Sequence, residues 1–231
     1  MTRRIANTLT PGGEERKWVE GPGVALEFLY SGPPDSRAKV VLAHGSGQPM
    51  DSPFMTTLAE GLGAAGVRVA RFEFPYMRQI RAGAKQRPPD KAPLLQQTWL
   101  EVLEHLGSGW VIGGKSLGGR MASMVADQAE TAGLLCLGYP FHPPGRPDTL
   151  RIEHLRGLKT PALIIQGTRD PFGRYDEVGT YPLASQIRLE WIDGGGHSYE
   201  PSASSGRTHQ QNLAAALEVA EGFVKSTGRD R

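Results

Sequence analysis

Residues 109–120 read GWVIGGKSLGGR, and this stretch decides the fold. Trp110 to Ile112 are typical of a short buried strand, and the residues that follow Arg120 keep helical spacing. Between them lies G-x-S-x-G, the pattern of a serine carried on a sharp strand-to-helix turn. The residues two positions before and after Ser116 are both glycine, so no side chain there collides with a neighbouring element. The stretch predicts an α/β fold in which a strand runs directly into a helix at Ser116.

The rest of the chain alternates short apolar runs with amphipathic helical patterns. Strands are predicted at 24–30, 39–43, 67–74, 110–113, 134–139, 162–166 and 187–192. Helices are predicted after Ser52, over 95–106, after Ser116 and over 209–224. This alternation is typical of a mostly parallel sheet with helices on both faces. We expect one domain over 1–231, an irregular segment at 1–20, and a polar loop from Pro75 to Pro93 as the only material for a lid.

Composition and charge exclude several classes of protein. The 231 residues carry 26 Lys and Arg against 24 Asp and Glu, a net charge of +2. This balance gives no strong field for nucleic acid or a membrane surface. Cys136 is the single cysteine, so no internal disulfide forms. The chain also lacks a signal-peptide pattern and an apolar run of about 20 residues. We predict a cytoplasmic protein without nucleic-acid or membrane partners.

The same stretch also fits a rival motif. Residues 109–116 match G-x-x-x-x-G-K-S, the phosphate loop of NTPases. In that motif a strand precedes the first glycine and the following residues form a loop around the phosphates. Here strand-forming residues lie inside the motif, and a helical pattern ending at Leu106 precedes it. The run 134–139 ends in Gly-Tyr-Pro, without an aspartate for magnesium. The NTPase is the less favoured alternative.

Two further residues complete a pattern of nucleophilic catalysis with Ser116. A serine hydroxyl needs a base to take its proton, and a carboxylate must orient that base. Asp170 follows the predicted strand 162–166, at the strand end where sites of open α/β sheets gather. His197 lies on a glycine-rich loop after the last strand. We predict Ser116 as nucleophile, His197 as base and Asp170 as acid. Asp193 is a rival acid, and Asp176 is a weaker one.

Backbone amides are the predicted donors to the negative oxygen that forms during acyl transfer. Leu117 starts the helix after the nucleophile, so its N–H points toward the substrate oxygen. The turn His44-Gly45-Ser46-Gly47 leaves the strand 39–43, and we predict the N–H of Ser46 as the second donor. His44 itself is expected to pack in the core.

Basic residues gather in the predicted loop after residue 74. Arg78 and Arg81 lead this group, which also contains Lys85, Arg87 and Lys91 against the single acid Asp90. One interpretation is that Arg78 and Arg81 bind an anionic substrate, such as a carboxylated ester. The other is a solvated loop whose charges bind nothing.

Four motifs in order, HGSG, GKSLGG, GTRDPFG and GGGHSY, resemble the small cap-less α/β-hydrolases related to dienelactone hydrolases. The resemblance implies the α/β-hydrolase fold with about seven or eight strands, no large cap, no cofactor and no metal ion. It also implies triad roles for Ser116, Asp170 and His197. Dienelactone hydrolases use cysteine where this chain has Ser116, which leaves the substrate open among small-molecule esters, thioesters and related acyl compounds. The alternative is a hydrolase fold retired from catalysis that serves as a binding or scaffolding module.

Overall fold

A computed structural model describes residues 7–9, 14–19, 26–129 and 131–227. Within them, nine strands form one sheet in the order β1-β2-β3-β5-β4-β6-β7-β8-β9. The strands are β1 Asn7–Leu9, β2 Glu15–Val19, β3 Leu26–Ser31, β4 Lys39–Ala43, β5 Arg68–Phe72, β6 Val111–Lys115, β7 Gly133–Leu137, β8 Ala162–Gly167 and β9 Ile187–Ile192. The helices are α1 Pro53–Ala64, α2 Pro75–Arg81, α3 Ala92–Leu106, α4 Leu117–Val125, α5 Tyr175–Val178 and α6 His209–Thr227, with a 3-10 turn at Glu153–Gly157.

The sheet is mostly parallel, as predicted. Neighbouring strands from β5 through β4, β6, β7 and β8 to β9 all pair in parallel. The other three strands extend the β5 edge in antiparallel pairs. The expectation of an irregular segment at 1–20 is wrong for its described part, because β1 and β2 lie there. Residues 1–6, 10–13 and 20 are outside the described part. These two strands bring the sheet above the expected size.

Ion pairs explain why β2 was missed. Its sequence, ERKWV, lacks the apolar alternation by which a half-buried strand is recognised. Arg68 of β5 instead donates to the Glu15 carboxylate at 2.8 Å, and Arg16 pairs with Glu27 of β3. Charged side chains thus link β2 to β3 beside it and to β5 beyond.

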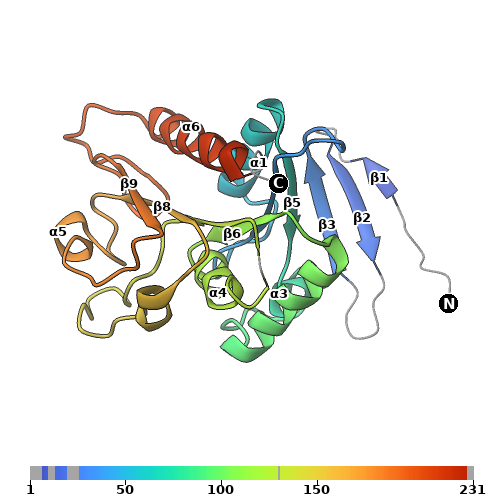
Figure 1. Cartoon of the computed structure of the whole chain (residues 1–231), viewed down its shortest axis with the longest axis horizontal. Coiled ribbons are helices and arrows are strands. Elements are labelled where there is room, and N and C mark those ends of the chain that lie inside the picture. The colour runs from blue at the N-terminus through green and yellow to red at the C-terminus, as the bar shows by residue number, and fades with distance from the viewer. Residues whose placement is uncertain (1–6, 10–13, 20–25, 130, 228–231) are drawn as a thin grey trace.

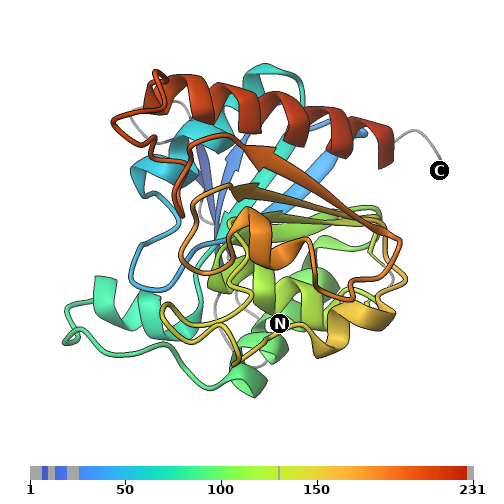
Figure 2. The same ribbon diagram turned by 90° about the vertical axis from the view of Figure 1, so that its left-hand side faces the viewer.

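The core has two layers, one on each face of the sheet. In β4, Val40 and Leu42 pack on one face, whereas Val41 and Ala43 pack on the other. Helices α1 and α6 cover the first face, and α3 and α4 cover the second (Figure 1). The turned view shows α6 lying along the upper face of the sheet (Figure 2). The predicted layer architecture is confirmed, with no large cap in the described chain.

The segment expected to be one polar loop contains a helix. Pro75 begins α2 at a position where the missing N–H of proline costs nothing. Asp90 then ties the segment together, because its carboxylate accepts the N–H of Tyr76 at 3.0 Å and pairs with Arg87 at 2.8 Å. Pro75 thus starts a helix, and Asp90 ties the exposed segment after it back to that helix.

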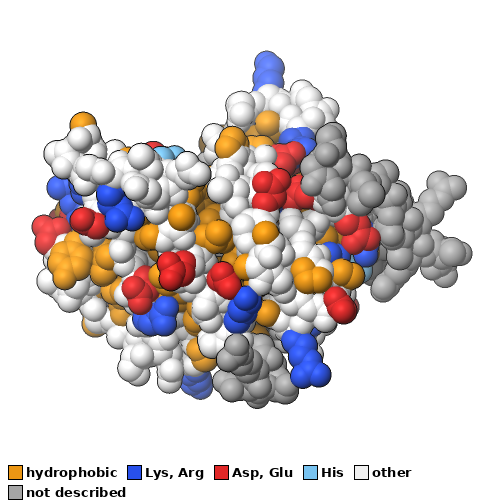
Figure 3. Space-filling model, turned by 90° about the horizontal axis from the view of Figure 1, so that it is seen from above, with side chains coloured by type: hydrophobic (Ala, Val, Ile, Leu, Met, Phe, Trp, Pro, Cys, Tyr) orange, Lys and Arg blue, Asp and Glu red, His pale blue; other side chains and the backbone are white. Residues whose placement is uncertain are grey.

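Charges on the surface are mixed in sign. Acidic and basic side chains are interspersed over the face that Figure 3 displays, in keeping with the net charge of +2. Among the helices in the described ranges, none combines the length and the apolar composition needed to cross a membrane.

The contact between β6 and β7 yields a prediction about stability. An ideal Cβ on Gly113 would lie 1.8 Å from the Leu135 carbonyl oxygen, which belongs to rigid backbone. We expect Gly113→Ala to lower the free energy of unfolding by about 3 kcal/mol or more. Urea unfolding measures it. Gly222→Ala is the control, because nothing lies within 4 Å of an added Cβ at that position. It should raise the free energy of unfolding by about 0.5–1 kcal/mol, since alanine favours the helical conformation of α6 more than glycine does. Equal effects of the two variants would contradict this account of the contact.

Candidate active site

Ser116 lies on the sharp turn that the sequence predicted. It joins β6 to α4 with φ 49° and ψ −111°, a conformation that non-glycine residues rarely adopt. An ideal Cβ on Gly114 would lie 2.1 Å from the Ala43 carbonyl oxygen, and one on Gly118 would lie 2.3 Å from the same atom. Both positions therefore require glycine. The turn packs directly on the backbone at the end of β4.

The rival phosphate loop is incompatible with this geometry. Residues 111–115 form β6, which pairs with β4 on one side and β7 on the other. Backbone groups that are paired within a sheet cannot also wrap around phosphates. We therefore discard the NTPase interpretation.

Asp170 and His197 are hydrogen-bonded to each other. The His197 Nδ1 atom lies 2.8 Å from Asp170 Oδ2, and the Asp170 side chain is fully buried. The carboxylate also accepts the Gln166 Nε2 amide at 2.8 Å and the Phe172 N–H at 2.9 Å. A carboxylate oxygen can only accept here, so Nδ1 carries the proton and Nε2 is free to act as a base. The structure thus brings together the residues predicted as acid and base.

The two rival acids occupy different surroundings. Asp193 and Asp176 are both exposed. In the described part of the chain, neither makes an ion pair with a histidine.

Close backbone packing fixes the loop that carries His197. An ideal Cβ on Gly167 would lie 2.3 Å from the carbonyl oxygens of both Gly195 and Gly196. The buried Tyr199 hydroxyl donates to the Ile165 carbonyl oxygen at 3.0 Å. The loop is therefore attached to the end of β8 at two points, one before and one after His197.

Ser116 and His197 line one cavity of about 260 Å³. The other lining residues are Gly45, Ser46, Gln48, Ser52, Phe54, Met55, Lys115, Phe172 and Ser198. Within the described residues the Ser116 hydroxyl makes no hydrogen bond to the imidazole. The predicted oxyanion donors fit this setting: Ser46 is in the cavity wall, and Leu117 is the first residue of α4, where an amide has no partner within its helix.

His44 stabilises the turn that carries Ser46. Its Nε2 atom accepts the Phe74 N–H at 3.1 Å, so the proton resides on Nδ1, which lies 2.7 Å from the Gly45 carbonyl oxygen. The ring is fully buried and packs against the rings of Phe74 and Tyr76. Burial lowers the pKa of His44 from 6.5 to about 4. The expected packing role of His44 agrees with these contacts.

The two arginines predicted to bind an anionic substrate lie outside the cavity wall. Arg81 donates to Asp51 at 2.7 Å and to Glu73 at 2.9 Å. Arg78 is partly buried, and burial lowers its pKa while the charge of Glu73 opposes that shift. Binding of an anionic substrate by Arg78 and Arg81 stays a prediction, which a comparison of KM values for charged and neutral esters tests.

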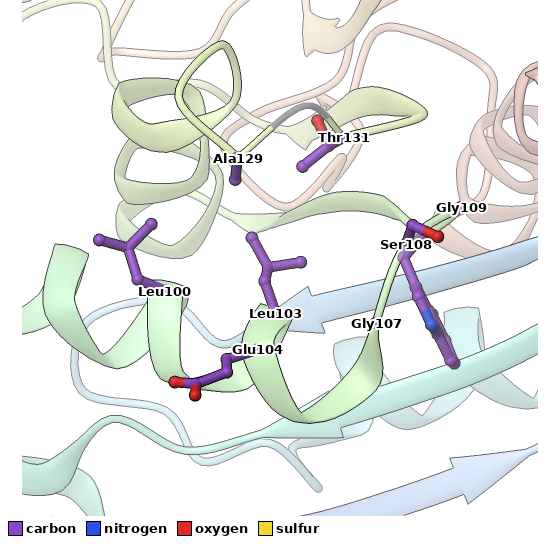
Figure 4. Close-up of a pocket in the computed structure, with 9 residues that line it drawn as sticks. Leu100, Leu103, Glu104, Gly107, Ser108, Gly109, Ala129 and Thr131 are labelled. Carbon is purple, nitrogen blue, oxygen red and sulfur yellow. The ribbon is translucent and has the colours of Figure 1, made fainter.

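A larger cavity, of about 380 Å³, lies elsewhere in the molecule (Figure 4). Leu100 and Leu103 of α3 face Ala129 and Thr131 across it. Glu104 is the one titratable residue among those that line it, and no nucleophile–base pair is present there. The larger cavity is therefore not the candidate active site.

A second serine–histidine pair has a structural role. Ser123 donates its hydroxyl proton to the Arg120 carbonyl oxygen at 2.8 Å, within α4. The His154 Nε2 atom, 2.8 Å from the same hydroxyl, must then be the donor in that contact. A protonated ring nitrogen cannot take the serine proton, so this pair does not form a second nucleophile.

Sequence reasoning missed three residues of the site. Gln166 orients Asp170, the Phe172 ring packs on the His197 ring at a centroid distance of 4.3 Å, and Lys115 borders the cavity. The signal for Gln166 was a polar residue at the end of the apolar run ALIIQ, and the signal for Phe172 was its place in GTRDPFG. In the described ranges, no group of three or more His, Cys, Asp and Glu side chains has a metal-binding arrangement.

Comparison with known proteins agrees with this fold. Residues 36–225 match the family described as Alpha/beta hydrolase domain. A dienelactone hydrolase from Anabaena variabilis superposes with a TM-score of 0.69 at 21% identity, covering 98% of this chain and 99% of its own. Est1E from Butyrivibrio proteoclasticus gives 0.67 at 14% identity, with 92% and 98% covered. A serine hydrolase without lid from Xanthomonas campestris gives 0.65 at 19%, with 94% and 98% covered. At these identities the likeness concerns the fold.

Burial of His44 leads to a prediction about pH. The unfolded chain binds a proton on this ring below about pH 6.5, whereas the folded chain binds it only near pH 4. The stability contributed by the neutral ring is thus complete above pH 6.5 and is lost as the pH falls toward 4, by about 3 kcal/mol. Urea unfolding from pH 7 to 4 should show a smaller pH dependence for His44→Gln than for the wild type. His209→Gln, at an exposed ring, is the control and should leave the dependence unchanged; an unchanged dependence in His44→Gln would contradict the prediction.

Proposed function

Since this chain belongs to the alpha/beta hydrolase family, we propose that it is a serine hydrolase that cleaves an ester, thioester or similar acyl bond. One observation carries the proposal: a serine on a strained turn and a histidine bonded to a buried aspartate line the same cavity. Family membership alone supports a hydrolase. The residue types and their arrangement favour acyl transfer through a covalent intermediate.

In the proposed reaction, the Ser116 hydroxyl oxygen attacks the substrate carbonyl carbon while His197 Nε2 takes the hydroxyl proton. The negative oxygen of the tetrahedral intermediate is held by the N–H groups of Leu117 and Ser46, each contributing on the order of 3 kcal/mol. Collapse of the intermediate transfers the proton from His197 to the leaving alcohol or thiol and leaves an acyl-Ser116 ester. Water, deprotonated by His197, then releases the carboxylic acid and restores the serine.

In the proposed cycle, Asp170 stabilises the imidazolium form of His197 that arises in each half-reaction. The carboxylate is fully buried, so its attraction for the charged ring is poorly screened by solvent. Its bond to Nδ1 also keeps Nε2 as the basic nitrogen. Hydrogen bonds between nucleophile and base often tighten only in the substrate complex, which accounts for the open Ser116–His197 pair.

The cavity favours a small, largely apolar acyl group. Phe54, Met55 and Phe172 contribute apolar surface, and the volume of about 260 Å³ is just below the usual range for small-molecule sites, about 300–1,000 Å³. The other function considered, a retired hydrolase fold used for binding, needs no reactive serine.

A labelling experiment separates these two functions. We expect a fluorophosphonate probe to modify Ser116 in the wild type and to leave Ser116→Ala unmodified, because only an activated serine attacks the probe. Mass spectrometry of the labelled peptide provides the measurement. Ser198→Ala removes a different hydroxyl from the same cavity and should label like the wild type. A wild type that stays unlabelled would favour the binding module.

Substitution of the acid tests the predicted pair. Asp170→Asn should lower kcat for p-nitrophenyl butyrate by a factor on the order of 10⁴, since the amide donates to Nδ1 and selects the wrong tautomer. Asp193→Asn is the matched control and should change kcat less than about twofold, because surface substitutions rarely matter. A large loss in the control with a small loss in Asp170→Asn would assign the role to Asp193 instead.

A further inference from the structure

Lys115 is a buried lysine inside the nucleophile turn. It is the last residue of β6, directly before Ser116, and its exposed fraction is only 7%. Burial of an ammonium group is unfavourable unless hydrogen bonds and opposite charges compensate for the lost hydration. The G-x-S-x-G pattern leaves this position free, so the turn itself does not require lysine.

The Lys115 ammonium contacts the loop that carries the base. Its Nζ atom donates to the His197 carbonyl oxygen at 2.9 Å. Gly138, with φ +66°, leaves the space for this bond: an ideal Cβ there would lie 2.6 Å from that oxygen and 3.0 Å from Nζ. The bond therefore links the residue before the nucleophile to the backbone of the base itself.

The rest of the side chain lies beside the opposite wall of the cavity. An ideal Cβ on Gly45 would lie 3.3 Å from Lys115 Cγ, and Nζ is 5.6 Å from the centre of the Phe54 ring. Lys115 thus borders both the turn that carries Ser46 and the loop that carries His197.

Burial of Nζ disfavours its protonated form, whereas the charged groups around it favour that form. Burial lowers the pKa of Lys115 to about 8, and the carboxylates of Asp170 and Glu200 oppose that shift. Asp170 follows β8, whereas Glu200 belongs to the loop after β9, which also carries the titratable His197 ring. At neutral pH the ammonium therefore donates a charge-assisted bond, which is stronger than a neutral one.

We propose that Lys115 is a positioning residue, whose ammonium holds the His197 backbone so that the imidazole stays over Ser116. The inference rests on the proposed function for its catalytic consequence. The alternative is that the ammonium binds an anionic group of the substrate directly. The two differ in outcome: positioning acts on kcat with every substrate, whereas direct binding acts on KM with anionic substrates only.

Lys115→Met tests the proposal, because it keeps the length of the side chain and removes the charge. Lys39→Met is the matched control: Lys39 also donates to a backbone carbonyl, that of Ser108 at 3.3 Å, but at the start of β4. We expect Lys115→Met to lower kcat for p-nitrophenyl butyrate on the order of tenfold or more, with KM within about threefold. Above about pH 8, wild-type kcat should fall as Lys115 loses its proton, and this decline should be absent in Lys115→Met.

Hydrogen exchange tests the positioning without reference to activity. Amides of residues 194–200 should exchange on the order of tenfold faster in Lys115→Met and at the wild-type rate in Lys39→Met. Unchanged exchange would overturn the proposal, as would an effect confined to KM for p-nitrophenyl succinate, a carboxylated ester. If Lys115→Met exchanges faster but the wild type is not labelled at Ser116, the positioning role stands and the proposed function is removed. If Lys115→Met does not fold, Lys115→Arg, which keeps the charge at high pH, should abolish the alkaline decline; its persistence would likewise overturn the proposal.

Discussion

The approach of the nucleophile turn to the β4 backbone is the constraint on which the site depends. Gly114 and Gly118 both lie against the Ala43 carbonyl oxygen, and neither position has room for a side chain. This contact places Ser116 beside the turn after β4, where Ser46 lies. The strained φ of Ser116 is maintained because β6 before it is paired within the sheet and α4 after it is packed against the sheet. Ser116 and the turn that carries Ser46 are therefore positioned by one packing contact.

The polar groups of the candidate site are held by burial rather than by a network on the surface. Asp170 is fully removed from solvent, yet its oxygens are satisfied by Gln166, the Phe172 amide and the His197 ring. A buried carboxylate with this set of donors has little freedom to turn. Its hydrogen bond to Nδ1 therefore fixes the orientation of the His197 imidazole. The same logic applies to His44, which is kept neutral and bonded on both nitrogens beneath the turn after β4.

Much of this arrangement could be predicted from the sequence, because it follows from short-range patterns. Apolar runs marked the parallel strands, and the glycines around Ser116 marked the turn. The two failures have different physical causes. Strand β2 is held by Arg68–Glu15, a pair whose members lie 53 positions apart in the sequence. In the segment 75–93 the Arg87–Asp90 pair is local, but its charges have the same sequence pattern as those of a solvated loop. The bond from Lys115 to His197 spans 82 positions along the chain, so no local pattern could have indicated it.

The strand order explains why glycines lie at the ends of β8 and β7, beneath the loop after β9. Ser116 follows β6 and His197 follows β9, which lie three strand spacings apart, or about 14 Å. The loop must therefore pass back over the ends of β8 and β7. At β8 it rests on Gly167, and at β7 it rests on Gly138, two positions where a Cβ would strike its carbonyl oxygens. Beyond β7 the next partner is Lys115 at the end of β6. The loop brings His197 back toward Ser116 because each strand end that it crosses presents either no side chain or a donor to its backbone.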